Sequence, residues 1–269
     1  SSRILISSVV KEEEISLREV LSILDETQKA KELNKELKER DKQKDEFLDT
    51  VAHELKTPIT SIRALSEILL ENDTVDAETK SKFLSSILSE SERVSRLIHH
   101  ILDLEKLATG KEKLDLKLND IKLSIENSMD SVSQIAHKKG VELHFESKNA
   151  IQLFYDEDRI LQVLINLLSN AIKFSEENIG KVKISIEINS DDLLISVTDN
   201  GRGIGEDELF SIFNKFYQSK NQTILKPVGS GLGLAISKQI IETHNGKIWA
   251  ENAQPKGAKI TFTLPINSN

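Results

Sequence analysis

The sequence contains no cysteine, few aromatic residues and no long apolar run. Without cysteine, the chain can form neither a disulfide nor a thiolate metal site, as is usual in a reducing cytoplasm. No uninterrupted apolar run reaches the roughly 18 residues that a membrane-spanning helix needs, and no signal peptide is visible. Lys and Arg form no dense cluster interleaved with aromatics, and the formal net charge is −8, so no nucleic-acid partner is expected.

What the chain has in quantity is Leu, Ile and charge. Charged residues make up 30% of the chain and aromatics 4%, a mixture that suits long amphipathic helices better than an all-β sandwich. A length of 269 residues favours two domains of ordinary size. The chain begins with Ser1, and its one methionine is Met129, so we interpret it as a cytoplasmic fragment of a longer protein.

Residues 1–44 are expected to form a helical signalling linker. Charges of both signs surround spaced leucines, as in a solvated helix or coiled coil. The leucines are Leu17, Leu21, Leu24, Leu33 and Leu37. The apolar spacing lapses at Asp41 and Lys44, which leaves a flexible charged tether as the alternative.

Residues 45–110 have the pattern of a helical hairpin. Apolar residues follow a three-four alternation from Leu48 to Leu69 and again from Phe83 to Ala108, which indicates the seam of a coiled coil or helical bundle. The short polar segment 71–79 between them is typical of a helix–helix connection. Two helices with one apolar stripe each bury those stripes poorly alone. We therefore expect two hairpins to pair into a four-helix bundle, which makes the protein a homodimer.

Beyond Gly110, short strands alternate with helices, which predicts an α/β sandwich with a largely antiparallel or mixed sheet over residues 111–269. The expected strands are Val141–Phe145, Val182–Ile188, Leu193–Thr198, Lys247–Ala250 and Ile260–Leu264. The expected helices are Ile121–His137, Asp158–Phe174 and Leu232–His244. The predicted fold class is therefore α plus α/β, with a helical linker and hairpin followed by the sandwich.

His53 is expected to face solvent. If Val51 occupies a d position of the seam and Leu55 the next a position, His53 falls at f, farthest from the seam. A histidine there has no packing role. It is either an incidental surface residue or a chemical one.

The neighbours of His53 favour the chemical interpretation. Glu54 can accept the proton from one imidazole nitrogen, which leaves the other nitrogen to attack an electrophilic phosphorus. Thr57 covers the same helix face at i+4. Pro58 cannot donate to the carbonyl of Glu54, so it loosens the helix and favours a bend beside His53.

A polar helix face indicates a nucleotide site. Asn166, Asn170 and Lys173 are spaced i, i+4 and i+7, opposite an apolar face. Amide oxygens suit the hard Mg²⁺ ion, and a nearby lysine suits phosphate. An ordinary solvated surface is the alternative.

Two glycine-rich elements follow this helix. The first has three alternate glycines from Gly201 to Gly205 after Asp199, whose carboxylate can accept from an adenine amino group. A type I′ hairpin turn is the alternative, but three glycines favour close backbone approach to a flat ligand. The second, GSGLGLAI at 229–236, precedes a helix, where amide donors and the dipole favour phosphate. We expect residues 206–228 between them to form a mobile lid.

The string FLDTVAHELKTPITSI, which starts at Phe47, resembles the H-box of sensor histidine kinases. The resemblance implies that His53 is the phospho-acceptor and that Glu54 is the general base. It also implies that Thr57 orients the water that hydrolyses the phospho-aspartate of a response regulator when the protein acts as a phosphatase.

The order of the later elements resembles the catalytic domain of histidine kinases, within the GHKL ATPase family that includes Hsp90, gyrase B and MutL. By this resemblance Asn166 and Asn170 belong to the N-box, with Asn170 the stronger candidate for Mg²⁺, and Lys173 contacts phosphate. The other implied nucleotide-binding positions are Phe174 and Asp199 at the adenine, Gly201, Gly203 and Gly205 in the first glycine box, Phe213 and Phe216 in the F-box, and Gly229, Ser230, Gly231, Leu232 and Gly233 in the second glycine box.

One position departs from the family pattern. Gln218 stands where many relatives carry an arginine that helps to stabilise the transferred phosphate. Lys173, Lys215 or Lys220 is expected to take over that role.

The resemblance implies a protein-histidine kinase that autophosphorylates His53 from Mg-ATP and passes the phosphoryl group to an aspartate of a separate response regulator. It also implies that an upstream sensor region anchors the parent protein in the cell membrane. Two other functions remain open. A conformational ATPase would share the nucleotide boxes without needing the His53 motif, and a non-catalytic dimeric scaffold would explain Gln218.

Overall fold

The computed structural model describes residues 2–72, 75–108, 113–147, 150–218 and 231–266, except for the side chains of residues 2–23, 40, 43 and 108. The chain divides into two compact units, Ser1–Thr57 and Pro58–Asn269. This division differs from the boundaries at 44/45 and 110/111 that we expect for functional domains, which remain a prediction.

The first unit is part of a single helix, α1, which runs from Ser2 to Glu71 and contains Pro58. Good helix formers dominate this stretch and no glycine interrupts it. Exposed ion pairs at i,i+4 spacing, such as Lys29 Nζ to Asp25 Oδ2 at 2.7 Å, add about 0.3 to 0.5 kcal/mol each. The linker is thus helical as predicted, and the flexible-tether alternative is wrong. Over the residues that are described, no helix is both long and apolar enough to cross a membrane.

The second unit begins with the last turns of α1 and continues into α2, Ala77–Ala108. Asp76 caps α2, because its carboxylate accepts hydrogen bonds from the backbone N–H and the hydroxyl of Thr79, at 2.9 and 2.7 Å. The helical hairpin pattern predicted from the sequence is therefore confirmed as two helices with a short connection. Near the end of α2, Asp103 lies 3.6 Å from Arg159 and accepts a hydrogen bond from Gln162 at 3.0 Å.

Helix α2 carries two apolar stripes, of which the sequence pattern identified one. Its predicted seam is half-buried at most positions and fully buried at Leu97 and Leu104. A second stripe is exposed and consists of Leu84, Leu88, Ile98 and Leu102. An isolated hairpin therefore leaves a row of large apolar side chains in water.

The rest of the second unit is a five-stranded mixed sheet in the order β2-β4-β5-β7-β6. The pair of β2 (Val141–Phe145) and β4 (Gly180–Ile188) is parallel. β4 pairs antiparallel with β5 (Asp192–Asp199), and β7 (Ala258–Pro265) pairs antiparallel with both β5 and β6 (Ile248–Asn252). All five strands were predicted within two residues of their observed ends.

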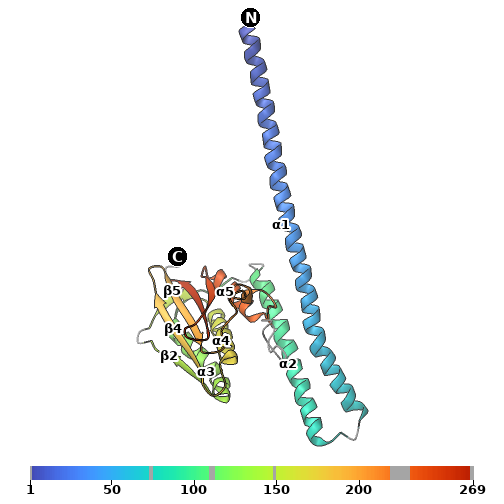
Figure 1. The fold of residues 1–269 in the computed structure, drawn as a ribbon, viewed down its shortest axis with the longest axis vertical. Helices are drawn as coiled ribbons and strands as arrows, with labels where there is room; N and C mark the ends of the chain where they lie inside the picture. The colour runs from blue at the N-terminus through green and yellow to red at the C-terminus, as the bar shows by residue number, and fades with distance from the viewer. Residues whose placement is uncertain (1, 73–74, 109–112, 148–149, 219–230, 267–269) are drawn as a thin grey trace. The chain divides into compact units, whose positions relative to one another are not determined.

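Three helices form the second layer, on one face of this sheet (Figure 1). They are α3 (Ile121–Lys139), α4 (Glu157–Phe174) and α5 (Gly233–Thr243). α4 buries seven apolar side chains, among them Val163, Leu167 and Ile172, and thereby turns its polar face away from the core. The predicted α/β sandwich is thus confirmed.

Two short strands were not predicted. β1 (Lys117–Asp120) and β3 (Gln152–Tyr155) form a separate antiparallel pair. β1 leads directly into α3, where Asp120 caps the helix by accepting from the N–H of Lys122 at 3.0 Å. This pair fixes where α3 begins.

Candidate active site

His53 lies in the first unit and is exposed, as its position in the heptad predicts. The hydroxyl of Thr57 donates a hydrogen bond to the carbonyl of His53 at 3.2 Å, so the two residues share one helix face. Glu54 is half-buried beside them. Pro58 interrupts the backbone hydrogen bonding one turn later, because it has no N–H to donate. The arrangement presents an imidazole to solvent next to a carboxylate.

The nucleotide-site residues gather in the second unit, starting with the polar face of α4. Asn166 is engaged: its amide donates to Ser237 Oγ at 2.9 Å, and a Cβ added at Gly233 would meet its Oδ1 at 2.2 Å. It therefore ties α4 to the start of α5. The Asn170 amide, in contrast, makes no hydrogen bond within the described part of the chain and is half-buried. Its oxygen is available to a ligand.

The end of α4 collects positive charge around one aromatic ring. Lys173 Nζ lies 4.7 Å from the centroid of the Phe174 ring, and Arg202 Cζ lies 5.2 Å from it. Burial lowers the pKa of Lys173, and the positive charges of Arg202 and Lys139 lower it further. A phosphate or carboxylate placed here would relieve this repulsion. The sequence analysis identified Lys173 and Phe174 but missed Arg202, which sits between the glycines of the first box.

Asp199 ends strand β5 and is only 8% exposed. Its Oδ1 accepts hydrogen bonds from the backbone N–H groups of Gly201 at 2.8 Å and Ala258 at 3.2 Å. Burial raises the pKa of Asp199, whereas these two hydrogen bonds lower it. One carboxylate oxygen is thus fixed by the backbone, and the orientation of the other is fixed with it.

The loop after Asp199 is packed too closely for side chains. A Cβ at Gly201 would lie 2.2 Å from the carbonyl oxygen of Phe174, and Gly203 has φ +78°. Asn252 holds the loop from β6, because its amide accepts from the N–H of Ile204 and donates to the carbonyl of the same residue, each at 2.8 Å. The hairpin-turn alternative is wrong, since β5 pairs with β4 and β7 and not with the next strand in sequence.

Gly257 is a further residue of this site that the sequence analysis did not identify. It has φ +115°, and a Cβ there would lie 1.8 Å from the carbonyl oxygen of Asp199. It also positions the N–H of Ala258 against Asp199. Its one sequence signal was the turn-like string QPKG before a strand, which says nothing of a partner almost sixty positions away.

The second glycine box is described from Gly231 onward; Gly229 and Ser230 lie outside the described residues. Gly231 has φ +66°, and a Cβ there would lie 2.7 Å from the backbone of Phe216. Leu232 is fully buried and precedes Gly233, the first residue of α5. The structure therefore brings this box against Phe216 on one side and Asn166 on the other.

The predicted lid is described only as far as Gln218, and the remainder, with Lys220, lies outside the described residues. Its first part folds as turns and a short 3₁₀ helix, η1 (Ser211–Phe213), with Phe213 buried. Tyr217 donates a hydrogen bond to Glu208 at 2.9 Å. Lys215 is exposed.

Within the described ranges, no three His, Cys, Asp or Glu side chains form a group that could hold a metal ion. The Asn170 amide makes no hydrogen bond among the described residues, so its oxygen can be offered to a cation more readily than that of Asn166, whose amide is bonded to Ser237.

Two family models match the chain. Residues 43–110 match the His Kinase A (phospho-acceptor) domain, and residues 155–268 match the histidine kinase-, DNA gyrase B- and HSP90-like ATPase. The second family is one of ATP-binding domains.

Individual proteins to which the chain is similar are also histidine kinases. The sensor histidine kinase WalK of Bacillus subtilis (strain 168) is 35% identical over 86% of the chain, which spans only 38% of that relative's length. The solved catalytic domain of histidine kinase ThkA is 32% identical, with a TM-score of 0.51, and the alignment covers 58% of the chain and all of that domain.

A solved structure of ThkA in complex with the response regulator protein TrrA has a TM-score of 0.67 and 31% identity, over 82% of the chain and 61% of that protein. The exposed His53, the buried Asp199 and the glycine loops thus occur in a chain in which the phospho-acceptor model is followed by the ATPase model. The chain belongs to the sensor histidine kinases.

Proposed function

We propose that the chain is a kinase core that transfers the γ-phosphoryl group of ATP to His53 and then to an aspartate of a response regulator. The observation that carries this proposal is the combination of an exposed His53 in H-E-x-x-T-P with a nucleotide site preorganised around Asp199. Either feature alone would be ordinary.

The protein would bind the nucleotide at both its adenine base and its phosphates. The second oxygen of Asp199 accepts a hydrogen bond from the adenine amino group, and Phe174 lies where the family has an aromatic near the base. Lys173 and Arg202 supply positive charge for the phosphates. Asn170 would hold Mg²⁺ through its amide oxygen, with Asn166 the weaker candidate because its amide is already bonded to Ser237. The bound ion would neutralise charge that develops on the phosphate oxygens.

In the transfer step, the unprotonated imidazole nitrogen of His53 attacks the γ-phosphorus in line. The N–P bond forms, the bond from phosphorus to the bridging β–γ oxygen breaks, and ADP leaves with that oxygen. Glu54 takes the proton from the other imidazole nitrogen. The regulator's aspartate carboxylate then attacks the phosphorus, the N–P bond breaks, and the imidazole of His53 takes back a proton from Glu54 and becomes neutral again.

Thr57 is proposed to act when the protein works as a phosphatase on the regulator. It would orient the water that hydrolyses the regulator's phospho-aspartate. Its hydroxyl lies on the same helix face as His53. A Thr57→Ala variant that keeps full phosphatase activity on a phosphorylated regulator would refute this role.

Dimerisation through the hairpin is proposed from the exposed stripe of α2, formed by Leu84, Leu88, Ile98 and Leu102. Each of these side chains is about half exposed, so covering them yields about 1 kcal/mol each, and a second hairpin can supply that cover. Sedimentation equilibrium tests this directly, and a monomer at micromolar concentration would contradict it.

The regulator is proposed to be a separate receiver domain that docks near His53, as direct transfer requires contact. Membrane attachment of the parent protein is proposed through a sensor region outside this sequence, on family resemblance alone. Cell fractionation of the full-length gene product tests that attachment.

The deciding experiment is incubation of the purified chain with γ-labelled Mg-ATP. We expect wild type to retain an acid-labile, alkali-stable label that His53→Ala loses, while both bind ATP with the same Kd. If wild type binds and hydrolyses ATP without retaining label, the conformational ATPase is the better description. If it binds no ATP, the scaffold with a degenerate site, suggested by Gln218, takes its place.

A further inference from the structure

The C-terminal end of α4 is where the nucleotide site needs its backbone to be rigid. Lys173 and Phe174 are the last two residues of the helix, and Ser175 caps it. The last carbonyls of a helix have no partner within the helix and carry the negative end of its dipole. Frayed ends would let the Lys173 ammonium and the Phe174 ring change position together.

Lys139, the last residue of α3, meets those carbonyls with its side chain. Its Nζ donates hydrogen bonds to the carbonyl oxygens of Ile172 at 2.8 Å, Lys173 at 2.6 Å and Ser175 at 2.7 Å. An ammonium group has three N–H donors, so all of them are used. The contact is partly buried, and burial lowers the pKa of Lys139.

The backbone at the end of α3 is fastened to the same turn. The carbonyl of Lys139 accepts a hydrogen bond from the N–H of Asn178 at 3.1 Å. Gly140, with φ +66°, approaches Asn178 so closely that a Cβ would lie 2.8 Å from its Cα. The ammonium therefore starts from an anchored helix end and not from a mobile one.

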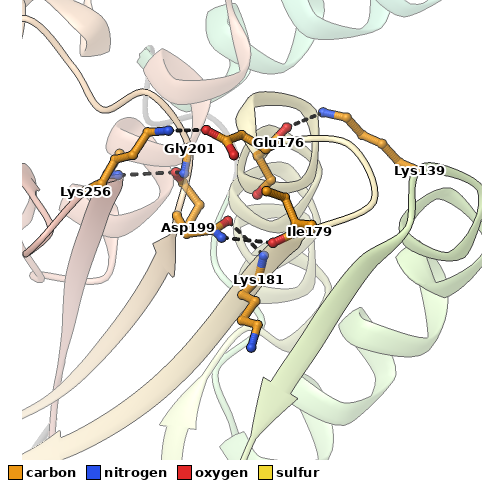
Figure 2. Close-up of polar contacts among 10 residues, drawn as sticks. Lys139, Glu176, Ile179, Lys181, Asp199, Gly201 and Lys256 are labelled. Carbon is orange, nitrogen blue, oxygen red and sulfur yellow. Dashed lines mark hydrogen bonds and ion pairs between the residues drawn. The ribbon is translucent and has the colours of Figure 1, made fainter.

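Other contacts on this turn come from the opposite side (Figure 2). Lys256, from the β6–β7 turn, pairs with the carboxylate of Glu176, and both side chains are about half exposed. Asn200 donates to the carbonyl of Ile179 at 3.0 Å and accepts from the N–H of Lys181 at 2.8 Å. These contacts hold residues 176–181, whereas Lys139 alone among the described side chains holds the carbonyls of Lys173 and Ile172.

The held carbonyls connect directly to the glycine loop that follows Asp199. The carbonyl of Phe174 lies between those of Lys173 and Ser175 in sequence, and it fills the space where a Cβ of Gly201 would be. The N–H of Gly201 in turn donates to Asp199. Displacement of the end of α4 would thus reach Lys173, Phe174 and Asp199 at once.

We propose that Lys139 is a positioning residue for nucleotide binding, which caps α4 through three carbonyl oxygens and thereby holds Lys173, Phe174 and the Asp199 loop in register. The proposal rests on the nucleotide-binding part of the proposed function. Lys139 touches no part of the expected nucleotide, and it acts only through the helix end.

The first test compares two variants that make the same chemical change on opposite sides of one turn, Lys139→Met and Lys256→Met. We expect Lys139→Met to raise the Kd for ATP about tenfold, because three charge-assisted hydrogen bonds are lost, and Lys256→Met to change it less than about twofold, because an exposed ion pair contributes little. KM for ATP should rise while kcat of His53 phosphorylation at saturating ATP falls less.

The second test restores the ammonium chemically, which the absence of cysteine makes possible. Lys139→Cys would be alkylated in the unfolded state with 2-bromoethylamine, which rebuilds a lysine-like ammonium, or with an ethyl halide, which gives a neutral side chain. Lys138→Cys, at the exposed neighbouring position on α3, receives the same treatments as a control. We expect aminoethylation to return ATP affinity to within about twofold of wild type at position 139, and the ethyl form to stay weak.

Amide hydrogen exchange of residues 171–176, without nucleotide, separates this inference from the proposed function. Faster exchange in the ethyl form, reversed in the aminoethyl form, supports the capping role even if wild type binds no ATP. Equal exchange and equal ATP affinity in the two alkylated forms would overturn the role of Lys139 while leaving the kinase assignment untouched. Equal loss in both forms would also overturn it, because the ammonium would then be irrelevant.

Discussion

The segment around His53 and the nucleotide site are built in opposite ways. His53 stands exposed on one face of a helix, with one side-chain hydrogen bond, from Thr57, to its carbonyl. Asp199 is buried and fixed by two backbone N–H groups, one of which comes from 59 residues further along the chain. The first arrangement is local in sequence, and the second depends on the tertiary fold.

The difference matches the role proposed for each part. As the proposed phospho-acceptor, His53 would have to be reached by a nucleotide and then by a regulator, so its side chain needs access more than support. A nucleotide site gains affinity from groups that are already in place before the ligand arrives. Substitutions near His53 should therefore change chemistry alone, whereas substitutions that disturb the packing around Asp199 should lower both stability and binding.

The largest expected effect comes from Gly257→Ala. A Cβ there would lie 1.8 Å from the carbonyl oxygen of Asp199, and φ +115° is strained for any L side chain. We expect a loss of about 2 to 4 kcal/mol in the free energy of unfolding, measured by urea denaturation. Gly205→Ala is the matched control, since its nearest neighbour is the movable carboxylate of Asp207 at 3.0 Å. Equal losses for the two variants would contradict the close packing at Gly257.

Asp199→Asn should separate binding from stability. The amide oxygen can still accept from Gly201 and Ala258, but the second position becomes a donor that cannot accept from adenine. We expect ATP affinity to fall by about 1.5 to 3 kcal/mol, roughly ten- to a hundredfold, as measured by calorimetry. Stability should change by less than about 1 kcal/mol, because burial disfavours the charge that is removed. Asp192→Asn, at the start of the same strand, should leave ATP affinity unchanged; a similar loss there would point to the strand and not to Asp199.

The smallest expected effect is a dependence of folding stability on pH, which arises from His244 in the second unit. His244 is buried, its Nε2 accepts from the N–H of Asp156 at 3.1 Å, and its Nδ1 lies 2.8 Å from the carbonyl oxygen of Ile240. This arrangement fits the neutral ring, and burial lowers the pKa of His244 despite the nearby Asp156. Below about pH 6.5 the unfolded chain therefore binds a proton that the folded chain resists.

Stability should fall as the pH drops from 6.5 to the lowered pKa of His244, by at most about 1.4 kcal/mol per pH unit. Burial also lowers the pKa of His100, which adds its own pH dependence. The contribution of His244 is therefore the difference between wild type and His244→Gln in the slope of stability against pH. Urea denaturation between pH 5 and 8 measures it. Parallel curves for the two proteins would refute the contribution of His244.

Much of the fold could be predicted because the relevant signals are local. The amphipathic pattern of α4 gives both its buried face and the shared polar face of Asn166, Asn170 and Lys173. Short runs of β-branched, aromatic and other apolar residues predicted all five strands of the main sheet. β1 and β3 escaped because each has four residues, and Leu118 meets Phe154 only through a pairing of distant segments.

The residues of the candidate site that lie in a contiguous motif were identified from the sequence. Those that reach the site only through the tertiary fold were missed. His53, Asp199 and the glycines are contiguous patterns. Arg202 reaches Phe174, Gly257 reaches Asp199 and Lys139 reaches Lys173 only after the sheet and helices are packed. No periodicity in a single segment carries that information.

The hydrogen bond from Ala258 to Asp199 has a consequence for the newly made chain. β7, which begins at Ala258, comes last in sequence among the described strands, yet it lies between β5 and β6 in the sheet. Synthesis proceeds from the N-terminus, so His53 and its helix leave the ribosome well before the carboxylate of Asp199 can acquire its second N–H donor. A nascent chain therefore presents His53 before the surroundings of Asp199 are complete, and ATP binding through Asp199, as proposed, would have to wait until β7 is inserted.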